Sequence, residues 1–109
     1  MYNVYLICST INNENVYKIG HTKRDVLKRI KELKTGNAGD ITLIESFNSK
    51  WGTKIESTLH RKYKNNRVRG EWFELNNEEI DSFIDECQLL HNNFELLSKS
   101  TLYEEKGKF

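Results

Sequence analysis

Proline is absent from the 109 residues of the chain, and cysteine occurs only twice. Without proline, the chain can hold neither a PxxP ligand segment nor a proline-rich linker. Cys8 and Cys87 show no CxxC or similar spacing, which excludes a disulfide scaffold and a zinc site built from cysteines alone. We therefore expect a protein of the reducing cytoplasm.

Long apolar runs are also missing. The longest clean apolar run covers residues 4–8, far short of the roughly 20 residues that span a bilayer. No basic segment precedes a hydrophobic one at the start of the chain, so we expect neither a signal peptide nor a membrane partner. Hydrophobic residues make up 37% and charged residues 30%, which is typical of a single globular domain.

The net charge of +1 conceals a strong segregation of charge along the chain. Residues 17–34 carry seven Lys/Arg and two acids, and residues 50–70 carry seven Lys/Arg and one acid. Residues 71–95 carry eight acids and no Lys or Arg. Such a division gives a polyanion one attractive face; the alternative is that these segments form ordinary solvated helix faces.

The chain is predicted to begin with a β-hairpin. Four segments are rich in β-branched and aromatic residues and predict strands: residues 2–8, 16–20, 41–47 and 71–75. Asn12 and Asn13 suit the turn between the first two strands. A basic loop at residues 67–70 precedes the fourth strand.

Three helices are predicted between and after these strands. Thr22 is the expected N-cap of the first helix, whose apolar stripe is Val26, Leu27, Ile30 and Leu33. Thr53 and Glu56 fit a capping box that begins the second helix, and Asn77 caps the third.

The resulting order β-β-α-β-α-β-α predicts an α+β domain with a small mixed or antiparallel sheet flanked by helices. The apolar spacing weakens beyond residue 93. We therefore expect a single domain over residues 1–93 and a partly disordered C-terminal tail over residues 94–109.

Several short motifs occur in an order that carries more information than each motif alone. The series begins with Asn3-Val4-Tyr5, Lys18-Ile19-Gly20, Thr22 and Arg29, and it continues with Ile55-Glu56, Leu59-His60-Arg61-Lys62 and Arg67-Val68-Arg69-Gly70-Glu71-Trp72-Phe73. The first half resembles the GIY-YIG nuclease superfamily, and the second half is similar to its bacteriophage-type (Orf172-like) DNA-binding branch. The resemblance covers roughly residues 3–75.

This resemblance implies a phage-encoded DNA endonuclease that acts in the host cell with one divalent ion, Mg²⁺ or Mn²⁺. It implies that Glu56 is the metal-ligating carboxylate, that Tyr5 activates water and that Arg29 binds the phosphate. Phosphodiester cleavage needs such groups, because a metal ion and a guanidinium both neutralise charge on the phosphoryl oxygens.

Two positions depart from the family motif: Asn3 replaces its first Gly, and Lys18 replaces its second Tyr. If the hairpin pairs residues whose numbers sum to 23, Lys18 lies directly opposite Tyr5. An ammonium at that place favours the phenolate and makes Tyr5 a better base. The alternatives are that Lys18 only neutralises phosphate or that the substitution marks an inactive site.

His60 follows Glu56 by four residues and so shares its helix face. The pair could complete a metal or phosphate site, and His60 is therefore a candidate catalytic residue. The alternatives are an exposed histidine without a role and, for Glu56, a capping contact with Thr53. His21 follows the Lys-Ile-Gly turn and could touch substrate, but we expect it to serve in a loop.

Six further basic residues are candidate contacts with the DNA backbone, and we name them the basic rim: Lys23, Arg24, Arg61, Lys64, Arg67 and Arg69. Such contacts position DNA without reading its bases. Trp72 and Phe73 could stack on bases, but we expect both in the core.

Two other functions remain compatible with the sequence. One is a DNA-binding module that keeps the fold and the basic rim with little or no catalysis. The other is a protein-interaction domain whose acidic residues 71–95 meet a basic partner. The fold alone does not decide which of these functions the protein has. The sequence does not predict the oligomeric state.

Overall fold

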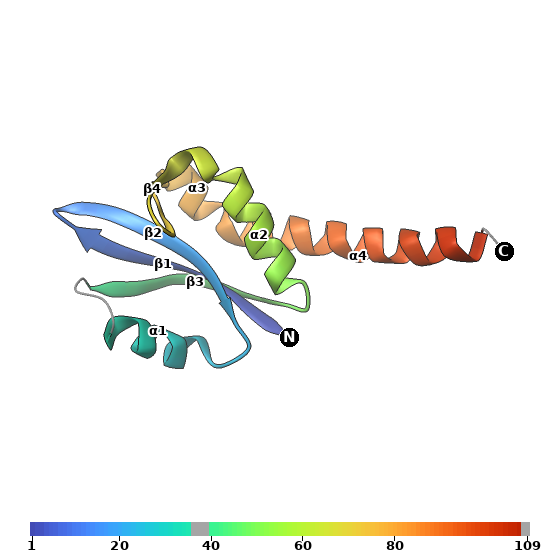
Figure 1. The fold of residues 1–109 in the computed structure, drawn as a ribbon, viewed down its shortest axis with the longest axis horizontal. Coiled ribbons are helices and arrows are strands. Elements are labelled where there is room, and N and C mark those ends of the chain that lie inside the picture. The colour runs from blue at the N-terminus through green and yellow to red at the C-terminus, as the bar shows by residue number, and fades with distance from the viewer. Residues whose placement is uncertain (36–39, 108–109) are drawn as a thin grey trace.

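The computed structural model describes residues 1–35 and 40–107 (Figure 1). Its elements in chain order are β1 (Tyr2–Ile11), β2 (Glu14–Thr22), α1 (Val26–Thr35), β3 (Ile41–Ser49), α2 (Gly52–Lys62), the 3₁₀ helix η1 (Lys64–Asn66), β4 (Arg67–Arg69), β5 (Trp72–Phe73), α3 (Asn77–Asp81) and α4 (Phe83–Gly107). The predicted α+β class is confirmed.

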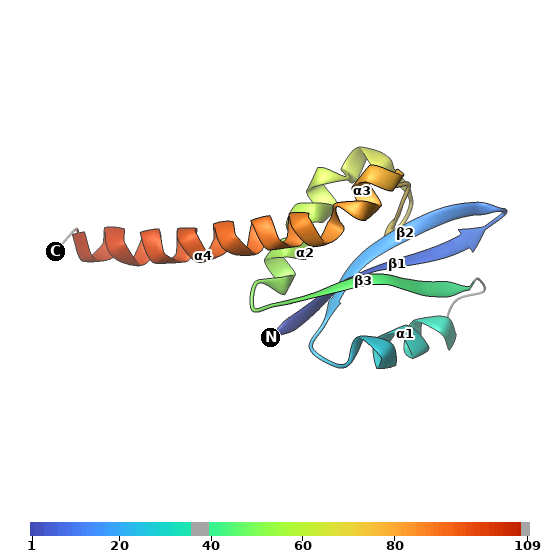
Figure 2. The same cartoon turned by 180° about the vertical axis from the view of Figure 1, so that it is seen from behind.

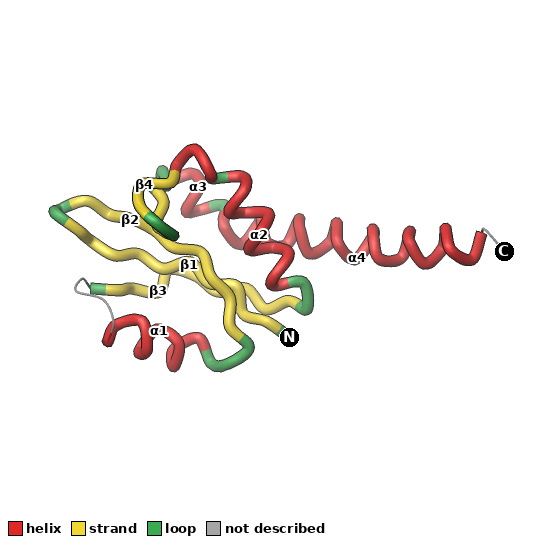
Figure 3. The backbone as a smooth tube through the Cα atoms, in the orientation of Figure 1, coloured by secondary structure: helices red, strands yellow, loops and turns green. Residues whose placement is uncertain are grey.

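The strands form one antiparallel sheet in the order β3-β1-β2-β5-β4. Helix α1 covers one face of this sheet, and α2 and α3 lie on the opposite face (Figures 1 and 2). Helix α4 packs on β3 and then projects beyond the sheet (Figure 3), which gives the molecule extents of 59 × 28 × 22 Å. None of the helices in the described part of the chain is long and apolar enough to span a membrane.

The predicted hairpin is present, and its turn is the one that the sequence indicates. Asn12 and Asn13 both have positive φ, 53° and 67°, as a two-residue turn of type I′ requires. The predicted register is wrong, however: Tyr5 pairs with Gly20 and Lys18 pairs with Ile7, so paired residue numbers sum to 25 rather than 23. A shift of two residues preserves the side-chain faces, so Tyr5 and Lys18 occupy diagonal positions on one face.

The predicted basic loop at residues 67–70 is instead strand β4 followed by a tight turn. Gly70 has φ +54° at this turn, a conformation that glycine adopts without steric cost. Strand β5 holds two residues rather than the five predicted. In the described part of the chain it pairs with β2 only between Tyr17 and Phe73, which leaves residues 18–22 of β2 as an edge of the sheet.

The start of α1 differs from the prediction. The helix begins at Val26, and the Asp25 carboxylate accepts the backbone N–H of Leu27 at 2.8 Å. The Thr22 hydroxyl instead accepts the N–H of Arg24 at 3.1 Å, before the helix begins. Thr22 is therefore not the N-cap, because Asp25 occupies the cap position next to Val26.

The capping box predicted at Thr53 and Glu56 is also wrong. Helix α2 begins at Gly52 after Trp51, and no side chain caps its first turn. The Glu56 side chain points to the sheet and hydrogen-bonds His21 of β2. The contact with β2 therefore replaces the local contact that the sequence pattern favours.

The third predicted helix is two helices. Asn76 rather than Asn77 caps α3, in a capping box with Glu79. The helical stretch is interrupted at Ser82, and α4 then continues to Gly107, past the residue where the apolar spacing weakens. The predicted boundary between residues 93 and 94 stays a prediction.

The core has two parts, one on each face of the sheet. The part under α2 and α4 contains Val4, Leu6, Tyr17, Ile19, Ile55, Leu59, Tyr63, Phe73, Phe83 and Cys87. The part under α1 contains Tyr5, Ile7, Val26, Ile30 and Ile41. Strand β1 is buried on both faces, which explains its continuous apolar run. Leu27, predicted in the apolar stripe, is 64% exposed, so that assignment is wrong.

Candidate functional site

Glu56 lies between two histidines from different elements. Its Oε2 hydrogen-bonds Nδ1 of His21 in β2, and its Oε1 lies 3.7 Å from Nε2 of His60. His60 Nε2 is 2.7 Å from the carbonyl oxygen of Ile19. Because a carbonyl only accepts, Nε2 of His60 carries the proton. His60 therefore binds the backbone of β2 beside Glu56. As predicted, Glu56 and His60 lie on the same face of their helix.

His21 is the functional candidate to which the sequence analysis gave too little weight, because it expected a loop residue. It lies in β2 rather than in a loop, with its side chain 37% exposed. The ring of Tyr2 packs edge-on against it, with ring centroids 5.5 Å apart. The available indication was strand alternation, which puts Tyr17, Ile19 and His21 on one face.

Tyr5 and Arg29 meet on the opposite face of the sheet. The Tyr5 phenol lies over Gly20, where an added Cβ would be only 2.4 Å from the phenol oxygen. The Arg29 guanidinium donates a hydrogen bond to Tyr5, and this bond holds the pKa of Arg29 above its usual value, with a smaller effect from Glu32. Tyr5 is 1% exposed, whereas the Arg29 side chain is 36% exposed. The buried phenol thus orients a guanidinium that reaches solvent.

Lys18 is paired with an acid and does not lie directly across from Tyr5. Its ammonium is 2.8 Å from the Glu71 carboxylate. The hydrogen bond from Lys18 is the main cause that lowers the pKa of Glu71. His60 and Arg29, which lie on opposite faces of the sheet, lower it further.

The candidate residues therefore form two groups around the free edge of β2. Glu56, His21 and His60 lie on the α2 face, while Tyr5 and Arg29 lie on the α1 face. The side chains of successive residues in a strand point to opposite faces of the sheet. Gly20 and His21 are consecutive, so the two groups are adjacent across this edge.

The fit of a divalent ion depends on one carboxylate. Within residues 1–35 and 40–107 no three His, Cys, Asp or Glu side chains form a group able to hold a metal. Glu56 is 20% exposed in its side chain, so water and substrate oxygens can reach it. Mg²⁺ commonly uses one or two carboxylates with water and phosphate oxygens, and Glu56 fits that requirement.

The basic rim comes from four separate segments of the chain. Lys23 and Arg24 follow β2; the ammonium of Lys23 lies 5.1 Å from the Tyr2 ring centre, and Arg24 pairs with Glu32 at 2.7 Å. The remaining rim residues lie at the end of α2, at the start of η1 and in β4: Arg61, Lys64, Arg67 and Arg69. Arg61 lines a hollow with Thr58 of α2 and Phe94 of α4, so the rim residues do not form one cluster.

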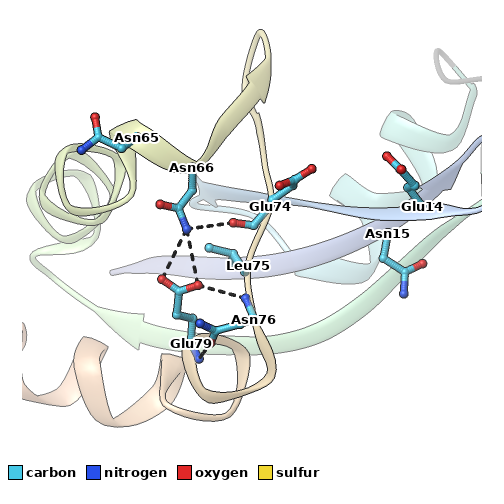
Figure 4. Close-up of a pocket in the computed structure, with 8 residues that line it drawn as sticks. All are labelled: Glu14, Asn15, Asn65, Asn66, Glu74, Leu75, Asn76 and Glu79. Carbon is cyan, nitrogen blue, oxygen red and sulfur yellow. Dashed lines mark hydrogen bonds between the residues drawn. The ribbon is translucent and has the colours of Figure 1, made fainter.

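A cavity of about 640 Å³ lies beside α3 (Figure 4). Its lining contains Glu14, Asn15, Asn65, Asn66, Glu74, Leu75, Asn76 and Glu79. The Asn66 amide donates to the Glu74 carbonyl at 3.0 Å, and Glu79 closes the capping box. Its acids disfavour phosphate, and no predicted site residue lines it.

Comparison with known proteins gives one family. The family model of the T5orf172 domain matches residues 3–88. No curated protein and no solved structure matches the chain. Because the match covers most of the 109 residues, the chain belongs to the T5orf172 domain family, a phage-associated and nuclease-related group.

Proposed function

We propose that this protein is a small endonuclease that hydrolyses phosphodiester bonds of DNA with the help of one divalent ion. The observation that carries the proposal is the position of Glu56, whose carboxylate faces His21 and His60 instead of capping its helix. Carboxylate and imidazole groups at a solvent-reachable edge are the side chains that metal-assisted hydrolysis and general acid–base catalysis use. Membership of a nuclease-related family supports the same activity.

Glu56 would hold the metal ion, Mg²⁺ or Mn²⁺, together with water and phosphate oxygens. A bound divalent ion supplies charge neutralisation at the phosphoryl oxygens. His21 and His60 hold the Glu56 carboxylate at the edge of β2, so the carboxylate needs little rearrangement to act as a ligand.

His21 is the residue that we assign to proton transfer. Glu56 engages its Nδ1, which fixes the ring orientation and leaves Nε2 to exchange a proton with water. A histidine is the usual side chain for this work near neutral pH.

Arg29 is the phosphate ligand in this proposal. Its planar guanidinium can donate two parallel hydrogen bonds to phosphate oxygens. Tyr5 is buried and bonded to Arg29, so we assign it first to positioning Arg29. The water-activating role that the resemblance implies for Tyr5 stays a prediction.

The test is incubation of the protein with supercoiled plasmid. We expect conversion to nicked or linear DNA with Mg²⁺ or Mn²⁺, and no conversion with EDTA. The second candidate is a DNA-binding module without catalysis, which the Lys18–Glu71 ion pair favours because it occupies the position of the second motif tyrosine. A gel shift without nicking at any metal concentration would support that alternative.

The basic rim gives a separate prediction about affinity. If Arg61 and Lys64 contact phosphates, duplex binding should weaken steeply with salt, and each replacement should flatten the log–log slope by about 0.9. The measurement is a salt titration of Arg61→Gln and Lys64→Gln beside Lys28→Gln, an exposed lysine outside the rim. An unchanged slope in the Arg61→Gln/Lys64→Gln double variant would put the DNA on another surface.

A further inference from the structure

A cavity of about 320 Å³ lies where the tips of the β1–β2 and β4–β5 hairpins meet. Its lining includes Ile11, Glu14, Val16, Val68, Arg69 and Trp72. Trp72 belongs to the side-chain cluster of the α1 face. The cavity therefore lies on the same face of the sheet as Tyr5, Lys18 and Arg29.

The walls of this cavity are apolar and partly open to solvent. Val68 is 52% exposed and Ile11 is 37% exposed, which is unusual for two branched side chains that line the same hollow. Trp72 is half-buried, whereas its neighbour Phe73 is fully buried. The prediction of a core position is thus correct for Phe73. Trp72 packs against the core on the α1 face and also lines the cavity.

A few polar groups complete the lining. Arg69 supplies a guanidinium, Glu14 a carboxylate and Asn12 an amide. An apolar hollow with a small number of polar groups is the usual form of a site for a small flat ligand. Tryptophan stacks on any nucleobase, arginine can stack or bind phosphate, and a carboxylate accepts from the amino group of cytosine.

The cavity lies next to the α1-face group of the proposed site. Glu71, next to Trp72 in the chain, is the ion-pair partner of Lys18. Val16 in the cavity wall and Lys18 lie two residues apart on one face of β2, about 7 Å along the strand. A DNA strand whose phosphate is held by Arg29 on this face would therefore place a neighbouring base at Trp72.

We propose that this cavity binds one unpaired nucleobase of the DNA substrate, stacked on Trp72. The inference rests on the proposed function and names the substrate class of that site: DNA with an unpaired base next to the cleaved bond. A base paired within a duplex cannot stack on a protein ring until it leaves the helix. The protein should accordingly bind single-stranded or mismatched DNA more tightly than matched duplex.

Binding of DNA with and without unpaired bases tests this inference. In a full-length Glu56→Gln background, which separates binding from cleavage, Trp72→Leu should weaken single-strand binding about 10-fold and affect matched duplex far less. Trp72→Phe, which keeps an aromatic ring, should keep most of the affinity. Equal single-strand affinity of the parent and Trp72→Leu would overturn the inference.

Fluorescence gives a readout that does not depend on whether Trp72→Leu folds. The chain has two tryptophans, so Trp51→Phe leaves Trp72 as the reporter. Oligothymidine should quench the tryptophan fluorescence of Trp51→Phe. It should not change the fluorescence of Trp72→Phe, in which Trp51 is the remaining tryptophan.

The possible failures are distinguishable. Absence of quenching together with metal-dependent plasmid cleavage would remove the base site and leave the nuclease proposal standing. Failure of the wild-type chain to bind or cleave any DNA would remove both. Concentration-dependent dimerisation that alters Trp72 fluorescence without DNA would assign the cavity to a second copy of the chain and overturn the inference.

Discussion

Replacement of Glu56 by glutamine should lower the rate of plasmid cleavage on the order of 100-fold or more. A neutral amide is a poor ligand for a hard cation, and loss of one strong electrostatic contact at a reacting phosphate has an effect of this size. Initial nicking rates with Mg²⁺ and with Mn²⁺, measured on contaminant-free protein, check this result.

The folded structure should survive this change. No cap hydrogen bond involves Glu56, and glutamine has nearly the same shape and can still accept a hydrogen bond from His21. We therefore expect DNA affinity and thermal midpoint close to those of the parent. Had Glu56 been the capping residue, the main loss would instead be stability.

Glu78→Gln is the matched control, because it makes the same substitution at an exposed acid of α3. It should leave cleavage unchanged. Metal-dependent nicking by Glu56→Gln at the parent rate would contradict the assignment of the metal ligand. Loss of folding in Glu56→Gln, with Glu78→Gln intact, would restore the structural interpretation of Glu56.

The parts of the fold that were predictable from sequence depend on local chemistry. Asn12 and Asn13 indicate their turn because asparagine tolerates positive φ, and both residues adopt it. The helical spacing of four residues put Glu56 and His60 on one face, and the two side chains do approach each other.

The parts that were not predictable depend on contacts between distant segments. The turn at Asn12 and Asn13 sets the register of β1 and β2, in which Tyr5 pairs with Gly20. The predicted partner of Tyr5, Lys18, is two residues away from Gly20 along β2. The Glu56–His21 contact joins residues 35 positions apart, and it outcompeted the local capping pattern at Thr53. The sequence pattern of α2 alone cannot show that Glu56 binds His21 instead of capping the helix, because His21 lies in β2.

The ion pair of Lys18 with Glu71 is a further case of this kind. The sequence analysis placed Lys18 directly opposite Tyr5 because it supposed that paired residue numbers in the hairpin sum to 23. The short β4–β5 hairpin brings an acid to the same ammonium. The lowered pKa of Glu71 follows from this pairing, which depends on a hairpin that the sequence suggested only as a loop and a longer strand.

Gly20→Ala should destabilise the protein by about 1–3 kcal/mol, the usual cost of forcing extra volume into a filled interior, and should reduce cleavage. An added Cβ would lie 2.4 Å from the Tyr5 phenol oxygen and 2.5 Å from its Cζ. Tyr5 is fully buried, so its ring cannot turn aside without disturbing the α1 side of the core. The phenol would then release Arg29, which is why activity should fall with stability.

A double-mutant cycle with Tyr5→Leu distinguishes this steric cause from a general effect of losing glycine. Removal of the ring should relieve the clash, so Gly20→Ala should cost less in the Tyr5→Leu background, with a coupling of about 1 kcal/mol or more in chemical denaturation. Gly70→Ala is the control: Gly70 has φ +54° and no atom within 4 Å of an added Cβ, so its cost arises from backbone strain and should be equal in both backgrounds. If Gly20→Ala costs the same with and without the Tyr5 ring, the phenol does not rest on Gly20, and the motif glycine must be required for another reason.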